Sequence, residues 1–100
     1  NEFAVLAEDI EKVITPRSRV LVLNFPTNPT GGIMPPEELE KVAALAVKHD
    51  LLVFTDEIYC ELLYDGRVHK SIVEYPGMRE RTVLLHGFSK AFAMTGWRLG

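Results

Sequence analysis

Hydrophobic residues recur along the chain with two different spacings, and the first two hydrophobic segments predict a helix followed by a strand. Residues 7–14 place Ile10, Val13 and Ile14 among four charged residues at a helical spacing. This predicts a short amphipathic helix with those three side chains available for packing. Residues 19–23, RVLVL, are β-branched or leucine after the arginine, and the run is short enough to be a buried strand.

A second helix and two further strands follow. The helix is expected to begin near Pro36, with acidic residues in its first turn, and to end with Lys48 and His49, so that the charges complement the helix dipole. Its buried face should comprise Leu39, Val42, Ala43 and Ala46. Residues 51–55 read as a second buried strand and residues 82–85 as a third strand, separated by a helical or irregular stretch over 57–64 and a turn at 65–66. A strand, crossover helix and strand in this order predict a parallel sheet in an α/β fold.

Polar residues suited to chemistry follow each predicted strand. Asn28 lies in the loop after the first strand, Asp56 and Tyr59 follow the second, and Ser89 and Lys90 follow the third. In open α/β sheets, ligands bind outside the carboxyl ends of the strands. The three strand ends are therefore expected to converge on one site.

Each of these residues also has an ordinary structural explanation when it is taken alone. A lysine such as Lys90 is usually a solvated surface residue, and an aspartate after a strand, such as Asp56, commonly caps a turn or helix. Asn28 before a proline suits a turn, and Arg98 beside Trp97 could be a stacked surface pair. Only their joint order favours a functional site.

Composition and charge narrow the classes of protein that remain. The 100 residues are 47% hydrophobic and 25% charged, which is typical of a globular domain with one modest core. A net charge of −3 gives no electrostatic footprint for nucleic acid or an anionic membrane, and no apolar run approaches the length of a membrane span. The single cysteine, Cys60, allows no internal disulfide, and no zinc-ligand spacing predicts a metal site. A cytoplasmic location is expected, and the start at Asn1 suggests an excerpt of a longer chain.

Three sequence strings, in this order and at this separation, closely resemble fold type I pyridoxal-phosphate (PLP) aminotransferases of class I/II. They are Asn28-Pro29-Thr30-Gly31, Asp56-Glu57-Ile58-Tyr59 and Ser89-Lys90-Ala91-Phe92-Ala93-Met94-Thr95-Gly96-Trp97-Arg98. The resemblance covers essentially the whole chain. It implies a three-layer αβα fold with a mostly parallel sheet, of which residues 1–100 would form part of the PLP-binding large domain. The N-terminal segment and the C-terminal small domain would lie outside these residues.

The resemblance also implies a role for each candidate residue. Lys90 would form the internal Schiff base, Asp56 would pair with the pyridine nitrogen, Tyr59 and Asn28 would bond the phenolic oxygen, and Arg98 would grip the phosphate. Lys90, Asp56 and Tyr59 would form the catalytic set. Only a primary amine can form the imine, and an opposite charge near the ring nitrogen favours its protonated form.

One position departs from the family pattern. Many relatives carry a serine three positions before the lysine, where this chain has Gly87. One phosphate contact is therefore expected to be missing, with Ser89 as the candidate replacement. An X-Pro bond in a loop that aims a side chain at a ligand is a place where cis is retained, and relatives show it, so we expect cis at Asn28-Pro29.

The resemblance implies an aminotransferase that moves an amino group between an amino acid and a 2-oxo acid, active as a full-length homodimer. The 100 residues alone are expected to be inactive, because other parts of the site lie outside them. Two alternatives share the fold: a PLP lyase or synthase, of the C-S β-lyase or aminocyclopropane-carboxylate synthase type, and an aminotransferase-like effector domain of a transcription regulator. The uninterrupted string at residues 91–98 favours the transaminase.

Overall fold

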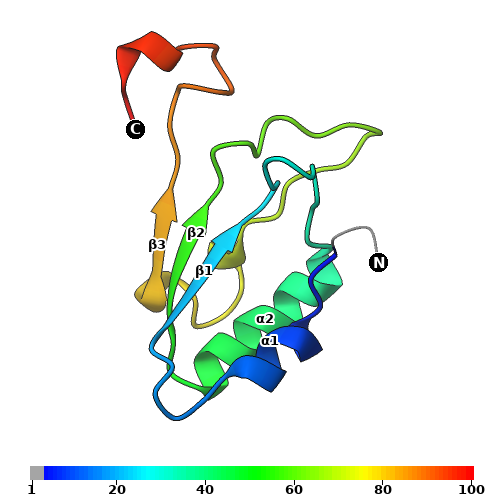
Figure 1. The fold of residues 1–100 in the computed structure, drawn as a ribbon, viewed down its shortest axis with the longest axis vertical. Coiled ribbons are helices and arrows are strands. Elements are labelled where there is room, and N and C mark those ends of the chain that lie inside the picture. Colours follow the sequence, from blue (N-terminus) through cyan, green and yellow to red (C-terminus); the bar gives the residue numbers. More distant parts are fainter. Residues whose placement is uncertain (1–3) are drawn as a thin grey trace.

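The computed structural model describes residues 4–100, which form a three-stranded sheet with two helices on one of its faces (Figure 1). The helices and strands are α1 (Ala7–Val13), β1 (Val20–Asn24), α2 (Pro36–Lys48), β2 (Leu52–Asp56) and β3 (Thr82–Leu85). Short 3₁₀ turns span Ile72–Glu74, Arg79–Arg81 and Thr95–Trp97. The predicted order of elements is confirmed, and the predicted bounds of β3 agree with the structure.

The sheet is parallel throughout, with the strands in the order β1-β2-β3. Asp56, the last residue of β2, is level with Asn24 at the end of β1 and with Leu85 at the end of β3. All three strands therefore end at the same edge of the sheet, as predicted, and the loops that leave them occupy one end of the molecule (Figure 1).

The core lies between the sheet and α2. Pro36 occupies the first turn of α2 and Lys48 ends it, as the sequence predicted. The helix buries Leu39, Val42, Ala43, Leu45 and Ala46. These side chains join Leu23 and Val53 of the sheet in one cluster, which also includes Ile10 of α1. Burial of this face is the main stabilising contribution that these elements share.

The prediction that the strands are buried is wrong for one face of the sheet. Leu23 and Val53 point into the core, but Val20, Val22 and Leu52 on the opposite face are exposed. Successive side chains of a strand alternate between faces, and within residues 4–100 the helices cover only one of them. The described residues thus supply two of the three layers expected.

A second packing prediction also needs correction. In α1, Ile10 is buried and Ile14 packs against the core from just beyond the helix, but Val13 is 72% exposed. Helical rotation turns Val13 away from α2, so the apolar face of this short helix is narrower than the sequence suggested.

The connecting segments are largely irregular. Residues 57–64 form turns instead of a helix, and the turn at Asp65-Gly66 is confirmed by positive φ angles at both residues. The Asn28-Pro29 peptide bond is cis, as predicted, and so is Phe25-Pro26. Across the described part of the chain, none of the helices has the length and apolar character needed to cross a bilayer.

Candidate functional site

Three of the predicted site residues come together beyond the ends of the strands. The Nδ2 of Asn28 donates a hydrogen bond to the Tyr59 hydroxyl at 3.1 Å. The Lys90 ammonium lies over the Tyr59 ring, 5.6 Å from its centroid. Asn28, Tyr59 and Lys90 follow β1, β2 and β3 respectively, so the convergence expected from the sequence is observed for these three side chains.

The loop that carries Asn28 is held in shape by hydrogen bonds among its own residues. The Thr27 hydroxyl donates to the Asn24 carbonyl at 2.6 Å, which ties the loop to the end of β1. The N–H of Thr27 donates to the Gly32 carbonyl, and the N–H of Gly31 donates to the Thr27 carbonyl. Gly31 has a positive φ of 70°, a conformation that a side chain disfavours. The asparagine is therefore presented from a closed loop.

Asp56 ends β2 with its side chain on the face opposite the core. Thr55 and Val53 are buried on the α2 side, and alternation along the strand directs Asp56 to the other face, half-exposed. Its Oδ1 accepts a hydrogen bond from the Ile58 N–H at 3.1 Å. The capping role considered from the sequence is thus present, and one carboxylate oxygen is sufficient for it.

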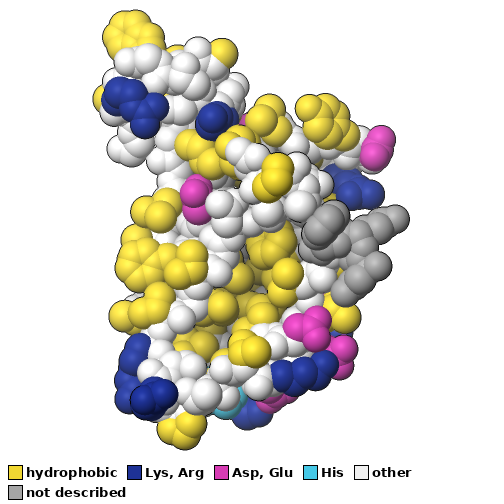
Figure 2. Space-filling view, in the orientation of Figure 1, with side chains coloured by type: hydrophobic (Ala, Val, Ile, Leu, Met, Phe, Trp, Pro, Cys, Tyr) yellow, Lys and Arg dark blue, Asp and Glu magenta, His cyan; other side chains and the backbone are white. Residues whose placement is uncertain are grey.

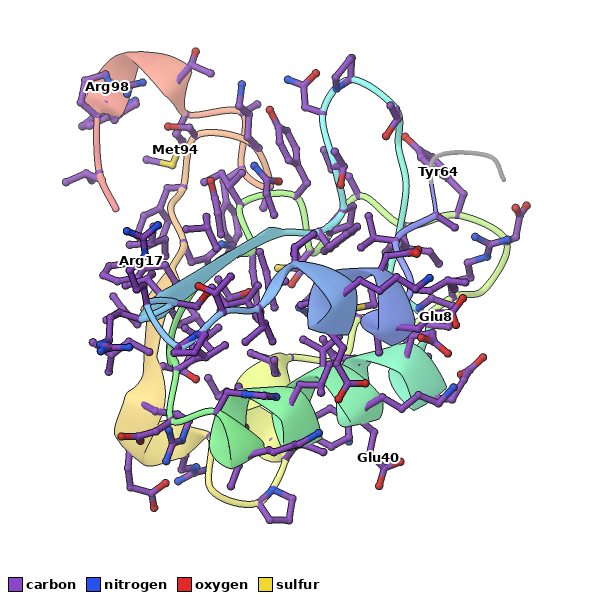
Figure 3. The ribbon with its side chains drawn as sticks, turned by 60° about the horizontal axis from the view of Figure 1, so that its bottom comes forward. Glu8, Arg17, Glu40, Tyr64, Met94 and Arg98 are labelled. Carbon is purple, nitrogen blue, oxygen red and sulfur yellow. The ribbon has the colours of Figure 1, made fainter. Side chains whose placement is uncertain are left out.

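The segment after β3 carries the remaining predicted residues. Ser89 is half-buried and Lys90 is exposed. The Arg98 guanidinium donates to the Thr95 carbonyl at 2.9 Å, and Figure 3 shows Arg98 on the C-terminal turn together with Met94. Within residues 4–100, no hydrogen bond or salt bridge joins Arg98 or Ser89 to Asn28, Tyr59 or Asp56.

Gly87 has a local structural reason. The residue is buried, and a Cβ placed on it would lie 3.0 Å from the Leu99 carbonyl oxygen and 3.1 Å from Cδ1 of Ile58. The Phe88 N–H donates to the same Leu99 carbonyl at 3.3 Å. Glycine therefore allows the C-terminal segment to approach the end of β3, where a serine would require the backbone to move.

The sequence interpretation gave no role to Glu57, which is the most buried charged side chain in this region, with 5% exposure. Its carboxylate is bonded by Ser71 Oγ at 2.7 Å, by Thr55 Oγ1 at 3.2 Å and by His69 Nε2 at 2.7 Å. Strand alternation could have indicated the burial, because Glu57 shares its face with Thr55. The partners His69 and Ser71 lie in a loop that offered no such signal.

A cavity of about 340 Å³ opens beside the converging side chains. Asn28 and Tyr59 line it, together with Pro26, Gly31 and the loop that includes Tyr64 and Arg67. Cys60 lies next to Tyr59, and burial raises the pKa of its thiol, with a further rise from the neighbouring Glu61 carboxylate. The thiol is therefore largely protonated near neutral pH and is a poor nucleophile.

The polar groups at this edge fit a PLP-like ligand. Asn28 and Tyr59 together present hydrogen-bond donors that suit an anionic ring oxygen, Lys90 supplies a primary amine beside them, and Asp56 supplies a carboxylate that suits a protonated ring nitrogen. Among residues 4–100, no three His, Cys, Asp or Glu side chains are grouped so as to hold a metal ion.

Comparison with known proteins identifies the relatives of the chain. The sequence profile described as "Aminotransferase class I and II" matches residues 1–100. The chain is 49% identical over its full length to aromatic-amino-acid aminotransferase 2 of Thermococcus litoralis and 47% identical to an aspartate aminotransferase of Pyrococcus abyssi, covering 26% of each. The crystal structure of an aromatic aminotransferase from Pyrococcus horikoshii superimposes with a TM-score of 0.95 at 46% identity, over 99% of this chain and 26% of that one. The chain thus spans about a quarter of the length of these proteins.

Proposed function

Because the chain belongs to the class I and II aminotransferase family, we propose that its parent protein is a PLP-dependent aminotransferase. It would move an amino group between an amino acid and a 2-oxo acid. The single observation that carries the proposal is the meeting of Asn28, Tyr59 and Lys90 at one edge of the parallel sheet, beyond Asp56.

In this proposal each side chain acts on a specific part of the cofactor. When bound, PLP supplies an electron-accepting ring for the electron pair at the substrate Cα. Asp56 would hold a proton on the ring nitrogen, because a nearby carboxylate favours the cationic form. The Asn28 amide and the Tyr59 hydroxyl would donate hydrogen bonds to the phenolic oxygen and stabilise its negative charge.

Lys90 would act twice. Its primary amine would tether the cofactor covalently as a Schiff base, and as a free amine it would accept the proton that leaves the substrate Cα. The amine already lies beside Tyr59, whose ring supports the ammonium through its π face.

Arg98 and Ser89 would bind the phosphate. The planar guanidinium offers a fork of donors matched to phosphate oxygens, and charge assistance strengthens such bonds. In the described residues Arg98 is engaged with the Thr95 carbonyl, so this role requires its side chain to turn toward the site. We therefore assign the phosphate contacts at this end of the sheet to Arg98 with Ser89, and leave none to Gly87.

The wider setting follows from the same proposal. Residues 1–100 would belong to the PLP-binding large domain of a cytoplasmic homodimer, with the rest of the site supplied by other parts of the chain. The lyase or synthase alternative and the effector-domain alternative share the fold, but no feature of the described residues favours either of them.

Borohydride trapping tests the proposal directly. The purified full-length protein should be yellow, and reduction should fix the cofactor irreversibly to Lys90, which peptide mass spectrometry would locate. Lys90→Ala should abolish the trapped label, whereas Lys70→Ala, at an exposed lysine paired with Glu74, should leave it in place. A label on any other lysine would contradict the assignment.

A further inference from the structure

The buried carboxylate of Glu57 lies directly behind the proposed cofactor site. An ionised side chain in a protein interior is unfavourable unless it is paired and hydrogen-bonded. Glu57 meets this condition with three partners: Thr55 and Ser71 donate to its Oε1, and His69 bonds its Oε2. Such a fully bonded carboxylate is rigid. Because Glu57 is adjacent to Asp56 in the chain, this rigidity also restrains the direction of Asp56.

Glu57 lies on the sheet one residue beyond the end of β2. Its N–H donates to the Leu85 carbonyl at 2.9 Å, which extends the β2–β3 pairing one residue past Asp56. Its side chain points to the α2 side together with that of Thr55, so the intervening Asp56 is forced to the opposite face. Fixing the Glu57 side chain on one face therefore fixes the direction of Asp56 on the other.

Ser71 connects the Glu57 carboxylate to the core. Ser71 precedes Ile72, which is 1% exposed and belongs to the core. Ser71 is itself held by a reciprocal cap, in which its N–H donates to a Glu74 carboxylate oxygen at 2.9 Å and its Oγ accepts from the Val73 N–H. Because Ile72 is fixed in the core, the hydrogen bond from the Ser71 hydroxyl holds the Glu57 carboxylate in place.

The backbone of Glu57 is also bonded to the turn that follows β2. The Glu57 carbonyl accepts the Cys60 N–H at 3.0 Å and so closes the turn that carries Tyr59. The same residue thus joins the end of the strand, the turn and the loop over 65–71. No other buried charged side chain among residues 4–100 connects these three segments.

We propose that Glu57, held by His69 and Ser71, is a positioning residue that sets the direction of the Asp56 carboxylate in the cofactor site. The inference rests on the proposed function, because it takes Asp56 to be the partner of the ring nitrogen. Glu57 itself faces away from the cofactor and touches no reacting atom. Its contribution is made through the backbone it shares with Asp56.

The test uses the full-length protein with PLP bound and follows the pH midpoint of the cofactor's visible absorption band, together with the PLP dissociation constant. Glu57→Leu removes every side-chain bond to the loop over 65–71. We expect the midpoint to move by about 0.5 pH unit or more, because the band follows protonation of the imine nitrogen, and the charge that Asp56 would hold on the conjugated ring nitrogen shifts the pKa of that imine. The dissociation constant should rise about fivefold.

Three comparisons separate positioning from other causes. Glu57→Gln retains an oxygen that can accept from Ser71 and Thr55 while losing the charge, so it should restore most of the normal midpoint. The matched substitution at an exposed position, Glu61→Leu, should leave the midpoint unchanged. In an Asp56→Asn background, Glu57→Leu should add little further shift, because effects that act through one group are not additive.

Each contrary result has a definite meaning. An unchanged midpoint in Glu57→Leu overturns the inference, and so does an equal shift in Glu57→Gln, which would show that charge acts directly. If Glu57→Leu does not fold, Ser71→Ala replaces it: a measurable shift of the midpoint supports the inference, and no shift overturns it. Absence of any cofactor band in the unaltered protein would instead overturn the proposed function, and the inference with it.

Discussion

At the scale of single residues, Asp56 combines one observed role with the proposed one. One oxygen of its carboxylate accepts the Ile58 N–H at 3.1 Å and stabilises the turn after β2. The side chain also lies on the open face of the sheet, half-exposed, at the edge where Asn28 and Tyr59 meet. A cap alone needs only an oxygen, whereas a partner for a protonated ring nitrogen needs a charge.

Asp56→Asn separates these two roles, because the substitution is nearly isosteric and asparagine caps about as well as aspartate. We expect the fold and much of the cofactor binding to persist while turnover falls about a hundredfold or more, since a tenfold loss corresponds to only about 1.4 kcal/mol. Transamination rate and cofactor occupancy should be measured on the same sample. Asp50→Asn, at an exposed carboxylate bonded to Arg81, should leave both unchanged. Normal turnover of Asp56→Asn at full occupancy would reduce Asp56 to a cap.

At the scale of elements, the junction of α1 and α2 depends on Glu38. Its Oε2 accepts the Ala7 N–H at 2.9 Å, which satisfies a free donor at the start of α1 from the first turn of α2. Lys41, one turn later, contacts the other oxygen. Hydrogen bonding by the Ala7 backbone and then by Lys41 lowers the pKa of the Glu38 carboxyl below its ordinary value.

The sign of this pKa shift predicts a pH-dependent stability. A carboxyl with a lowered pKa in the folded state stabilises that state above its unfolded pKa, and the contribution disappears as pH falls through the folded value. Glu38→Gln should therefore be less stable than the unaltered protein at about pH 7, and the difference should vanish by about pH 3. Urea unfolding at both pH values measures it. The control Glu40→Gln, on the exposed side of α2 in Figure 3, should show no such difference, and a gap that persisted at low pH would contradict the assignment.

At the scale of the whole molecule, the uncovered face of the sheet is the most unusual feature. Val20, Val22 and Leu52 are exposed there, and Val83 and Leu85 of β3 add to them. Figure 2 shows hydrophobic side chains gathered over the region of the strands, with charged side chains both along the lower edge and at the upper end. Contiguous exposed apolar surface commonly marks a contact with further protein. Because the chain spans about a quarter of its relatives' length, we propose that other segments of the parent chain cover this face.

Val22→Thr tests whether this face is covered in the full-length protein. Threonine keeps the shape and the strand preference of valine but places a hydroxyl on the face, which costs about 1–3 kcal/mol when it is buried without a partner. Thermal or urea unfolding should show a loss of that size. Val13→Thr on α1, where the valine is 72% exposed against 70% for Val22, is the matched control and should change little. Equal, small effects at both positions would mean that the open face remains in water.

Much of this architecture was predictable from local patterns. The bounds of α2 follow from Pro36, the acidic first turn and the basic end, and β3 follows from a short apolar run. The parallel order follows from the crossover helix, and it is sufficient to bring the residues after each strand to one edge. The three motif strings then indicated the family, which the family profile confirmed.

Tertiary structure alone decided the rest. An apolar run in a strand does not reveal which of its faces will be covered, because that depends on elements distant in sequence, so Val22 and Leu23 could not be told apart. Two of the three partners of Glu57, His69 and Ser71, come from a loop more than ten residues away, and no periodicity links them to β2. Gly87 likewise acquires its reason only when the Leu99 carbonyl approaches it. Sequence patterns determine what each segment can form, whereas burial and long-range hydrogen bonds depend on which segments meet.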